Sequence, residues 1–198
     1  MLTEFIDFVD SVLPSVSPDL RDSAKSAILQ FERTGETLKY MMLNPLKELS
    51  QGDIISKVPF SFFDESGYQK LFIADALVLS TSCHIDQKDK ILLAPVFPLD
   101  AFDGNLADLK RNIIYDYMYL PDPVLSDKFI DFEYINTYHT DLIRKRITDG
   151  KITRMGSLNQ LGYYFFLVKL TVYLMRKEDG DTFSERNFLR HIRKRICH

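Results

Sequence analysis

The sequence predicts an α+β protein: a small β-barrel that is preceded by a helical unit and followed by two helices. Short β-rich apolar segments separated by turn signals run from residue 52 to residue 99, and stretches of helical spacing flank them on both sides. A chain of 198 residues can bury a sizeable core without disulfides. We expect a helical unit at residues 1–50, the barrel with a buried helix at 51–177, and a basic tail helix at 178–198.

The first fifty residues contain three stretches of helical spacing, at 4–13, 17–33 and 36–43, and a proline or glycine follows each of them. Their apolar stripes are too large to be left in water. Packing against one end of the barrel and service as a dimerisation arm both remain open.

The barrel strands are expected at residues 53–63, 68–80 and 90–98, where β-branched and aromatic residues dominate. The second strand has no apolar/polar alternation at residues 76–79, which is typical of a strand buried on both faces. We expect further elements in this order: a helix at 106–114, a short strand at 115–120, a half-exposed strand at 128–138, a helical turn at 139–147, a last short strand at 151–155 and a buried helix at 160–177.

The composition favours a protein of the cytoplasm. Cys83 and Cys197 are far apart in the sequence and fit reduced thiols better than a disulfide framework. The N-terminal stretch is interrupted by acidic residues and lacks a basic start, so we expect no signal peptide. The longest apolar run, residues 163–175, is too short to cross a bilayer, so we expect no membrane association.

The charge is distributed unevenly along the chain. Residues 1–138 contain 12 Lys and Arg against 22 Asp and Glu, whereas residues 139–198 contain 13 against 6. The basic part could bind a polyanion such as RNA, or it could complement the acidic part of its own chain or of a second copy. The pI of about 5.8 favours the second interpretation, because dedicated nucleic-acid binding domains are strongly basic.

A series of short motifs spans most of the expected barrel. They are Gly52-Asp53-Ile54-Ile55, Ala76-Leu77-Val78-Leu79-Ser80, Ala94-Pro95-Val96, and Leu120-Pro121 followed by Ser126 and the segment Phe132 to Thr137. In this order they resemble the MazF/PemK family of toxin endoribonucleases over about residues 52–173. The resemblance implies an SH3-like barrel, RNA as the substrate, and an antitoxin or a second copy as a protein partner.

The sequence departs from the family at two positions that matter for cleavage. The resemblance implies an arginine just ahead of the Leu77 strand, where this chain reads Ala74-Asp75-Ala76. It also implies a Ser or Thr after the proline of the next strand, where this chain reads Val96-Phe97-Pro98. RNA cleavage needs a base, an acid and a cation beside the phosphate, and an aspartate in the place of the arginine would repel that phosphate.

The densest group of reactive residue types is Ser80 to Asp86. If this stretch is extended, Cys83 and His84 point in opposite directions, so they form no nucleophile and base pair by themselves. His84 and Asp86 would then share one face, as a hydrogen-bonded pair at the barrel rim that could line a pocket. Asp75 and Ser80 are further candidate binding residues. Because the chain has no CxxC or HxxxH spacing and no phosphate-binding glycine loop, we expect neither a metal nor a cofactor.

A second group follows the half-exposed strand and contains imidazole, hydroxyl and guanidinium groups. For a ribonuclease, His139 would be the base or acid, and Arg144 or Arg146 would bind the phosphate, with Thr140 beside them. A solvated turn is the simpler interpretation. In the tail, the basic residues Arg190, Arg193 and Lys194 could be solvated, or could face RNA or a protein.

Two functions follow from these observations. The first is an RNA-directed toxin or defence protein related to MazF/PemK endoribonucleases, with displaced or degenerate catalytic residues. The second is a non-catalytic protein-interaction module on the same barrel, which the aspartate at position 75 favours. Whether the chain is an enzyme stays open; if it is, we expect a metal-independent endoribonuclease that works as a cytoplasmic dimer.

Overall fold

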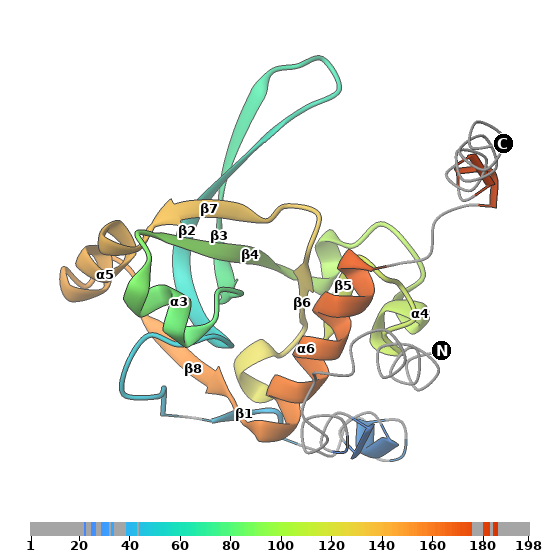
Figure 1. The fold of residues 1–198 in the computed structure, drawn as a ribbon, viewed down its shortest axis with the longest axis horizontal. Coiled ribbons are helices and arrows are strands. Elements are labelled where there is room, and N and C mark those ends of the chain that lie inside the picture. The colour runs from blue at the N-terminus through green and yellow to red at the C-terminus, as the bar shows by residue number, and fades with distance from the viewer. Residues whose placement is uncertain are drawn as a thin grey trace, which may run out of the picture.

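The computed structural model describes residues 39–42 and 44–175, together with short helical pieces at 22, 25–26, 29–31, 33, 180–182 and 184–185. Most of the predicted helical unit and of the predicted tail lies outside these residues, including the helix expected at 4–13. The described chain is α+β and is built around an antiparallel sheet of eight strands (Figure 1).

The strands of this sheet are β1 (Met41–Met42), β2 (Asp53–Phe63), β3 (Gln69–Val78), β4 (Lys90–Pro98), β5 (Tyr117–Tyr119), β6 (Lys128–Asp131), β7 (Asn136–His139) and β8 (Arg154–Leu158). They are hydrogen-bonded in the order β1-β8-β2-β3-β4-β6-β5, and β7 pairs with the first half of β4. The helices are α3 (Ser82–Gln87), α4 (Leu106–Lys110), α5 (Thr140–Thr148) and α6 (Gln160–Leu174), with 3₁₀ turns η2 (Leu99–Ala101) and η3 (Pro123–Leu125).

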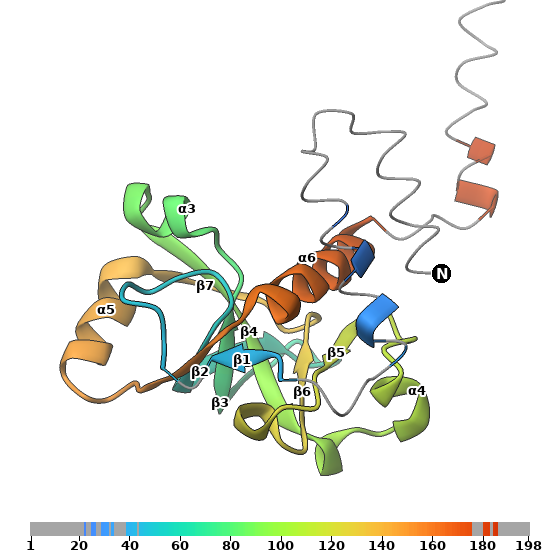
Figure 2. The same cartoon turned by 90° about the horizontal axis from the view of Figure 1, so that it is seen from below.

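Apolar residues form two main cores. The larger core lies between the sheet and α6, which buries Phe165, Phe166 and Val172. The second core contains residues of β2, β3 and β4 together with Ile85 of α3 and Ile143 of α5. Figure 2 shows α6 lying across the sheet, while α3 and α5 lie next to each other at the other end. Within the described residues no helix is long and apolar enough to span a membrane.

The sheet does not close into a barrel through main-chain pairing, because its two end strands in the described chain, β1 and β5, do not pair with each other. Side chains of β7 nevertheless reach the outer edge of β2. The Asn136 amide accepts from the Ser61 N–H at 2.8 Å and donates to the Ser61 carbonyl at 3.1 Å, and the Tyr138 hydroxyl donates to the Pro59 carbonyl at 2.7 Å. The predicted closed barrel is therefore wrong in detail, and β7 approaches β2 through side chains instead.

The carboxylate of Asp53 holds together the segment before β2 and the strands β2 and β8. Asp53 is fully buried and accepts from the Arg154 guanidinium at 2.7 Å and from the Ser157 hydroxyl. Arg154 also donates to the main-chain carbonyls of residues 46, 47 and 48. The aspartate of the Gly-Asp-Ile-Ile motif therefore has a structural role, because a buried carboxylate must be paired.

Three segments differ from the sequence prediction. Residues 41–42 form strand β1 rather than part of a helix, because the buried Asp122 carboxylate accepts the N–H groups of Tyr40 and Met41 at 2.8 and 2.9 Å. Residues 82–87 form helix α3 rather than an extended segment, because the Thr81 hydroxyl caps it by accepting the His84 N–H. The stretch 128–138 is two strands, β6 and β7, which pair with opposite ends of β4.

Candidate functional site

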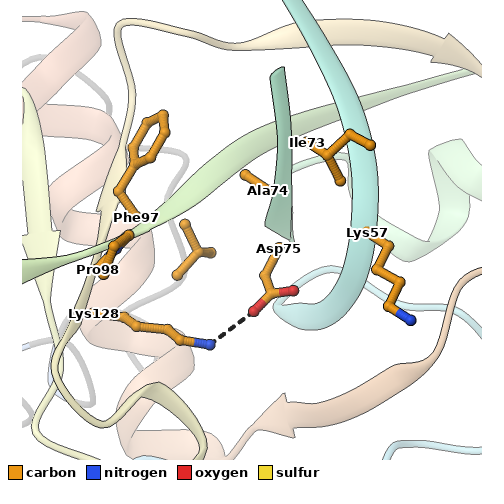
Figure 3. A pocket seen from close by; sticks show the side chains of 8 residues that line it. Lys57, Ile73, Ala74, Asp75, Phe97, Pro98 and Lys128 are labelled. Atoms are coloured by element: carbon orange, nitrogen blue, oxygen red, sulfur yellow. Dashed lines mark hydrogen bonds and ion pairs between the residues drawn. The ribbon is translucent and has the colours of Figure 1, made fainter. Parts of the chain in front are cut away.

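An open groove of about 340 Å³ lies between β3 and β4 (Figure 3). It is lined by apolar side chains and by three ionisable ones: Lys57, Ile73, Ala74, Asp75, Val96, Phe97, Pro98 and Lys128. The groove exists because the two strands separate. Their pairing ends at Asp75 and Val96, after which β3 continues along β2 and β4 continues along β6.

The Asp75 carboxylate lies at the base of this fork and forms an ion pair with Lys128. The Lys128 Nζ is 2.8 Å from Asp75 Oδ2, and the two side chains are 30% and 22% exposed. Lys128 is the first residue of β6, and the register of β6 on β4 brings it there, because Lys128 pairs with Pro98. Because both side chains are still partly exposed, the pair remains reachable by a ligand.

Lys57 lies on the β2 side of the groove in an unusual backbone conformation. Its φ is +57°, a left-handed value that is uncommon for residues other than glycine, and the register of β2 on β3 shifts between Ile55 and Val58. Such a β-bulge re-aims a side chain and is frequent near functional sites. Lys57 is exposed and forms no ion pair with any residue in the described part of the chain.

The groove therefore has a net charge of +1, from two lysines and one aspartate. It can bind an anion at Lys57, with Phe97 and Ile73 as apolar neighbours. Asp75 is its one carboxylate and could act as a base, but no histidine, serine or threonine lines the groove. Across the described residues there is also no group of three or more His, Cys, Asp or Glu side chains that could hold a metal ion.

The predicted ribonuclease residues lie at the other end of the sheet, on β7 and α5. His139 is exposed and directly precedes α5, with Lys90 opposite it on β4. Arg144 Nη2 donates to Asp86 Oδ1 at 3.0 Å and to the Ile85 carbonyl at 3.3 Å, so this guanidinium joins α5 to α3. Arg146 is half-buried on the same helix. The structure thus pairs Arg144 with a carboxylate, where the sequence suggested a free cation for phosphate.

Three further predicted binding residues have structural contacts. The Ser80 hydroxyl accepts the Leu92 N–H at 2.9 Å, and the buried Thr140 hydroxyl donates to the Lys88 carbonyl at 3.3 Å. The expected side-by-side pair of His84 and Asp86 depended on an extended chain; positions two apart on a helix such as α3 do not face each other. Asp86 pairs with Arg144 instead. Arg190, Arg193 and Lys194 lie outside the described residues.

Sequence reasoning singled out Asp75 but missed Lys57 and Lys128. The sequence signal for Lys57 is weak: this lysine precedes Val58-Pro59, and a proline inside a strand is typical of an edge or a bulge. Lys128 had no local signal, because its contact with Asp75 joins residues 53 positions apart.

Comparisons with known proteins give distant similarity among solved structures. No protein-family model and no curated protein matches the chain. Among solved structures, a chain of the crystal structure of MazE-MazF (Form-II) from Deinococcus radiodurans is similar, with a TM-score of 0.40 and 14% sequence identity. The similarity covers 65% of this chain and 97% of that chain. A likeness at this level assigns neither an activity nor a partner.

Proposed function

We propose that this chain is an RNA-directed, toxin-like protein related to the MazF/PemK endoribonucleases, and that RNA binds in the groove between β3 and β4. The observation that supports this most is Lys57, a lysine with no ion-pair partner among the described residues, which a β-bulge with a left-handed φ places on the groove wall. An exposed ammonium group is a common ligand for an RNA phosphate.

The location of the groove supports the same function. The sequence resemblance assigns a catalytic arginine to the Ala74 to Ala76 stretch and a hydroxyl residue to the stretch after Pro95. In the structure Ala74 and Asp75 form one wall of the groove, and Val96 to Pro98 form the other. The two positions where this sequence departs from the family therefore lie together around one cavity.

The groove offers a reduced set of groups for cleavage. Attack by a ribose 2′-hydroxyl on the adjacent phosphate requires a base to take its proton, an acid to protonate the leaving oxygen, and a cation to stabilise the phosphate charge. Asp75 could be the base, and Lys57 or Lys128 could supply the positive charge. Asp75 is already paired with Lys128, which makes it a weak base. We therefore expect the groove to bind RNA but to cleave it slowly or not at all.

The experiment compares RNA binding and cleavage without divalent metal for Lys57→Ala, Lys128→Ala, His139→Ala and Arg144→Ala. If RNA binds in the groove, Lys57→Ala should weaken RNA binding several-fold. It should also reduce the dependence of the binding constant on salt concentration by about one phosphate contact, whereas His139→Ala should have no effect. If His139→Ala and Arg144→Ala abolish cleavage and Lys57→Ala does not change binding, RNA binds at α5 and the groove assignment is wrong.

The second candidate function is a non-catalytic protein-interaction module. The Asp75–Lys128 ion pair favours it, because the place of the family's arginine is taken by a carboxylate whose charge is already balanced. This function predicts no RNA binding above background even at about 50 mM salt, where phosphate contacts are strongest. An antitoxin-like partner and a cytoplasmic location are parts of either proposal.

A further inference from the structure

The ion pair of Asp75 and Lys128 has hydrogen-bonding capacity that the protein does not use. Lys128 Nζ donates to Asp75 Oδ2 at 2.8 Å, and no residue in the described part of the chain donates to Asp75 Oδ1. An ammonium group has three N–H donors, and each carboxylate oxygen can accept more than one hydrogen bond. Both side chains line the groove and are partly exposed (Figure 3). The pair therefore offers a ligand an N–H donor beside the two acceptor oxygens of a carboxylate.

We propose that this ion pair recognises the base of a guanosine in the bound RNA, an inference that rests on the proposed function of the groove. The pairing edge of guanine presents the O6 acceptor beside the N1–H and N2–H donors. Lys128 can donate to O6 while the Asp75 carboxylate accepts from N1–H and N2–H, so every group on this edge has a partner. Hydrogen bonds with an ionised partner are stronger than those between neutral groups.

The other bases of RNA match the pair less well. Uracil presents O4 and N3–H correctly, but its O2 acceptor would face Asp75 Oδ1. Adenine and cytosine would each place an amino group against the ammonium of Lys128 and a ring-nitrogen acceptor against the carboxylate. A site with charged hydrogen-bonding groups rejects such bases, because its polar groups would lose partners on binding. The ion pair thus selects guanine.

Phe97 supplies a surface on which the selected base can stack. It follows Val96, the strand partner of Asp75, and its half-buried side chain lines the same groove. Its ring packs against the rings of Phe72 and Phe129, with centroids 5.3 and 6.0 Å away. Unpaired RNA bases are commonly stacked on aromatic side chains while their edges form hydrogen bonds. A ring already held by its neighbours loses little freedom when a base binds.

The charges of the groove separate a site for the base from a site for the phosphate. Asp75 and Lys128 balance each other, so an uncharged base fits beside them better than a phosphate does. Lys57 has no ion-pair partner among the described residues, and in Figure 3 the Asp75 carboxylate lies between Lys128 and Lys57. A nucleotide whose base meets the ion pair therefore has Lys57 as a cation for its phosphate. The volume of about 340 Å³ is in the range of small-ligand sites.

Fluorescence anisotropy with labelled RNA tests the selection. The probes are oligouridylates of about ten nucleotides with one central guanosine, adenosine or inosine, at about 50 mM salt. The guanosine probe should bind about tenfold more tightly than the adenosine probe, and inosine, which lacks the N2 amino group, should fall between them. Asp75→Asn should abolish the preference, because an asparagine amide pairs well with adenine and presents an N–H group to the guanine donors.

The readout is the ratio of the dissociation constants for the adenosine and guanosine probes, since a general change in charge affects both probes alike. Asp127→Asn is the matched control: Asp127 is an exposed carboxylate next to Lys128 in the sequence and does not line the groove. It removes the same charge and should keep the wild-type ratio. Lys57→Ala should weaken both probes equally and also keep the ratio. Circular dichroism of each variant verifies that it is folded.

The possible failures are distinguishable. Equal binding of the guanosine and adenosine probes, or a preference that Asp75→Asn retains, would overturn guanine recognition, and a Lys57→Ala effect would still support the RNA groove. Unchanged binding in Lys57→Ala would instead overturn the groove assignment and the guanine site with it. GMP carries the same base edge without an RNA chain. GMP that binds more tightly than the guanosine probe would assign the site to free guanine nucleotides and overturn RNA as the source of the base.

Discussion

The pH dependence of folding provides a sharp check on the buried carboxyl group of Asp131. Its side chain is 5% exposed, and its Oδ1 accepts the N–H of Glu133 at 2.8 Å. Burial raises the pKa of Asp131 from 3.8 to about 7; the hydrogen bond from Glu133 opposes this shift, and the negative charges of Glu133 and Asp116 add to it. Asp131 thus holds a proton at a pH where most aspartates have lost theirs.

The sign and size of the effect follow from this difference. Between about pH 4 and pH 7 the folded chain binds a proton on Asp131 that the unfolded chain has released, so the free energy of unfolding falls as the pH rises. One pKa unit corresponds to about 1.4 kcal/mol, which gives a loss of up to about 4 kcal/mol by pH 8. Asp131→Asn keeps the acceptor for the Glu133 N–H and cannot ionise, so it should lose this slope.

Urea unfolding followed by circular dichroism, in steps from about pH 5 to pH 8, measures the difference between the two proteins. Asp131→Asn should gain stability over the wild type from pH 5 up to about pH 7, by about 3 kcal/mol in total, and the difference should then level off. Glu65→Gln, at the exposed tip of the hairpin formed by β2 and β3, is the control and should follow the wild type. A stability difference between Asp131→Asn and wild type that stays constant with pH would refute the reasoning.

Two further predictions concern one buried and one partly buried polar group. Lys169 is 1% exposed, its Nζ donates to the carbonyls of Ile114 and Asn112, and burial lowers its pKa to about 8, against the attraction of Asp116. The folded chain releases this proton first, so the wild type should gain about 2 kcal/mol of stability between pH 8 and pH 9.5, and Lys169→Met should show no such gain in urea unfolding. Asn136→Ala should lose about 1 to 2 kcal/mol in thermal unfolding, and Asn136→Asp should lose more, because a carboxylate has no donor for the Ser61 carbonyl.

The strands and helices that the sequence predicts best are those whose patterns are local. β2, β4 and α6 begin where turn or capping signals stand, and apolar residues dominate each of them over nine or more positions. In such segments the burial that decides the structure is already visible in the spacing of the side chains. The predicted helical turn at 139–147 likewise corresponds to α5.

The segments that the sequence does not predict depend on partners far along the chain. The N–H groups of Tyr40 and Met41 meet the carboxylate of Asp122, more than 80 residues later, and this contact fixes residues 41–42 as a strand. Barrel closure fails for a related reason. β7 reaches β2 with the side chains of Asn136 and Tyr138, and an alternating pattern cannot show whether a strand will pair through its main chain or its side chains.

In the candidate site, too, one residue can be predicted from the local sequence and the others depend on distant parts of the chain. Asp75 was visible from the sequence as a departure from an otherwise family-like strand, and it does lie on the groove wall. Its partner Lys128 depends on the register of β6 on β4, and the position of Lys57 depends on a bulge within β2. Neither is a property of the local sequence, so the charge of the groove could not be read from Asp75 alone.

The two lysines of the groove change what an aspartate at position 75 implies. Considered alone, Asp75 puts a negative charge where the resemblance to MazF/PemK enzymes implies the positive charge of an arginine. In the groove, Lys57 and Lys128 outweigh it and leave a net charge of +1, so attraction for a phosphate remains. What a lysine lacks compared with an arginine is the bidentate geometry. An ammonium group is a point charge and cannot hold two phosphate oxygens in the fixed fork of a guanidinium. If the groove binds RNA, we therefore expect this chain to differ from MazF/PemK enzymes more in the rate of cleavage than in affinity.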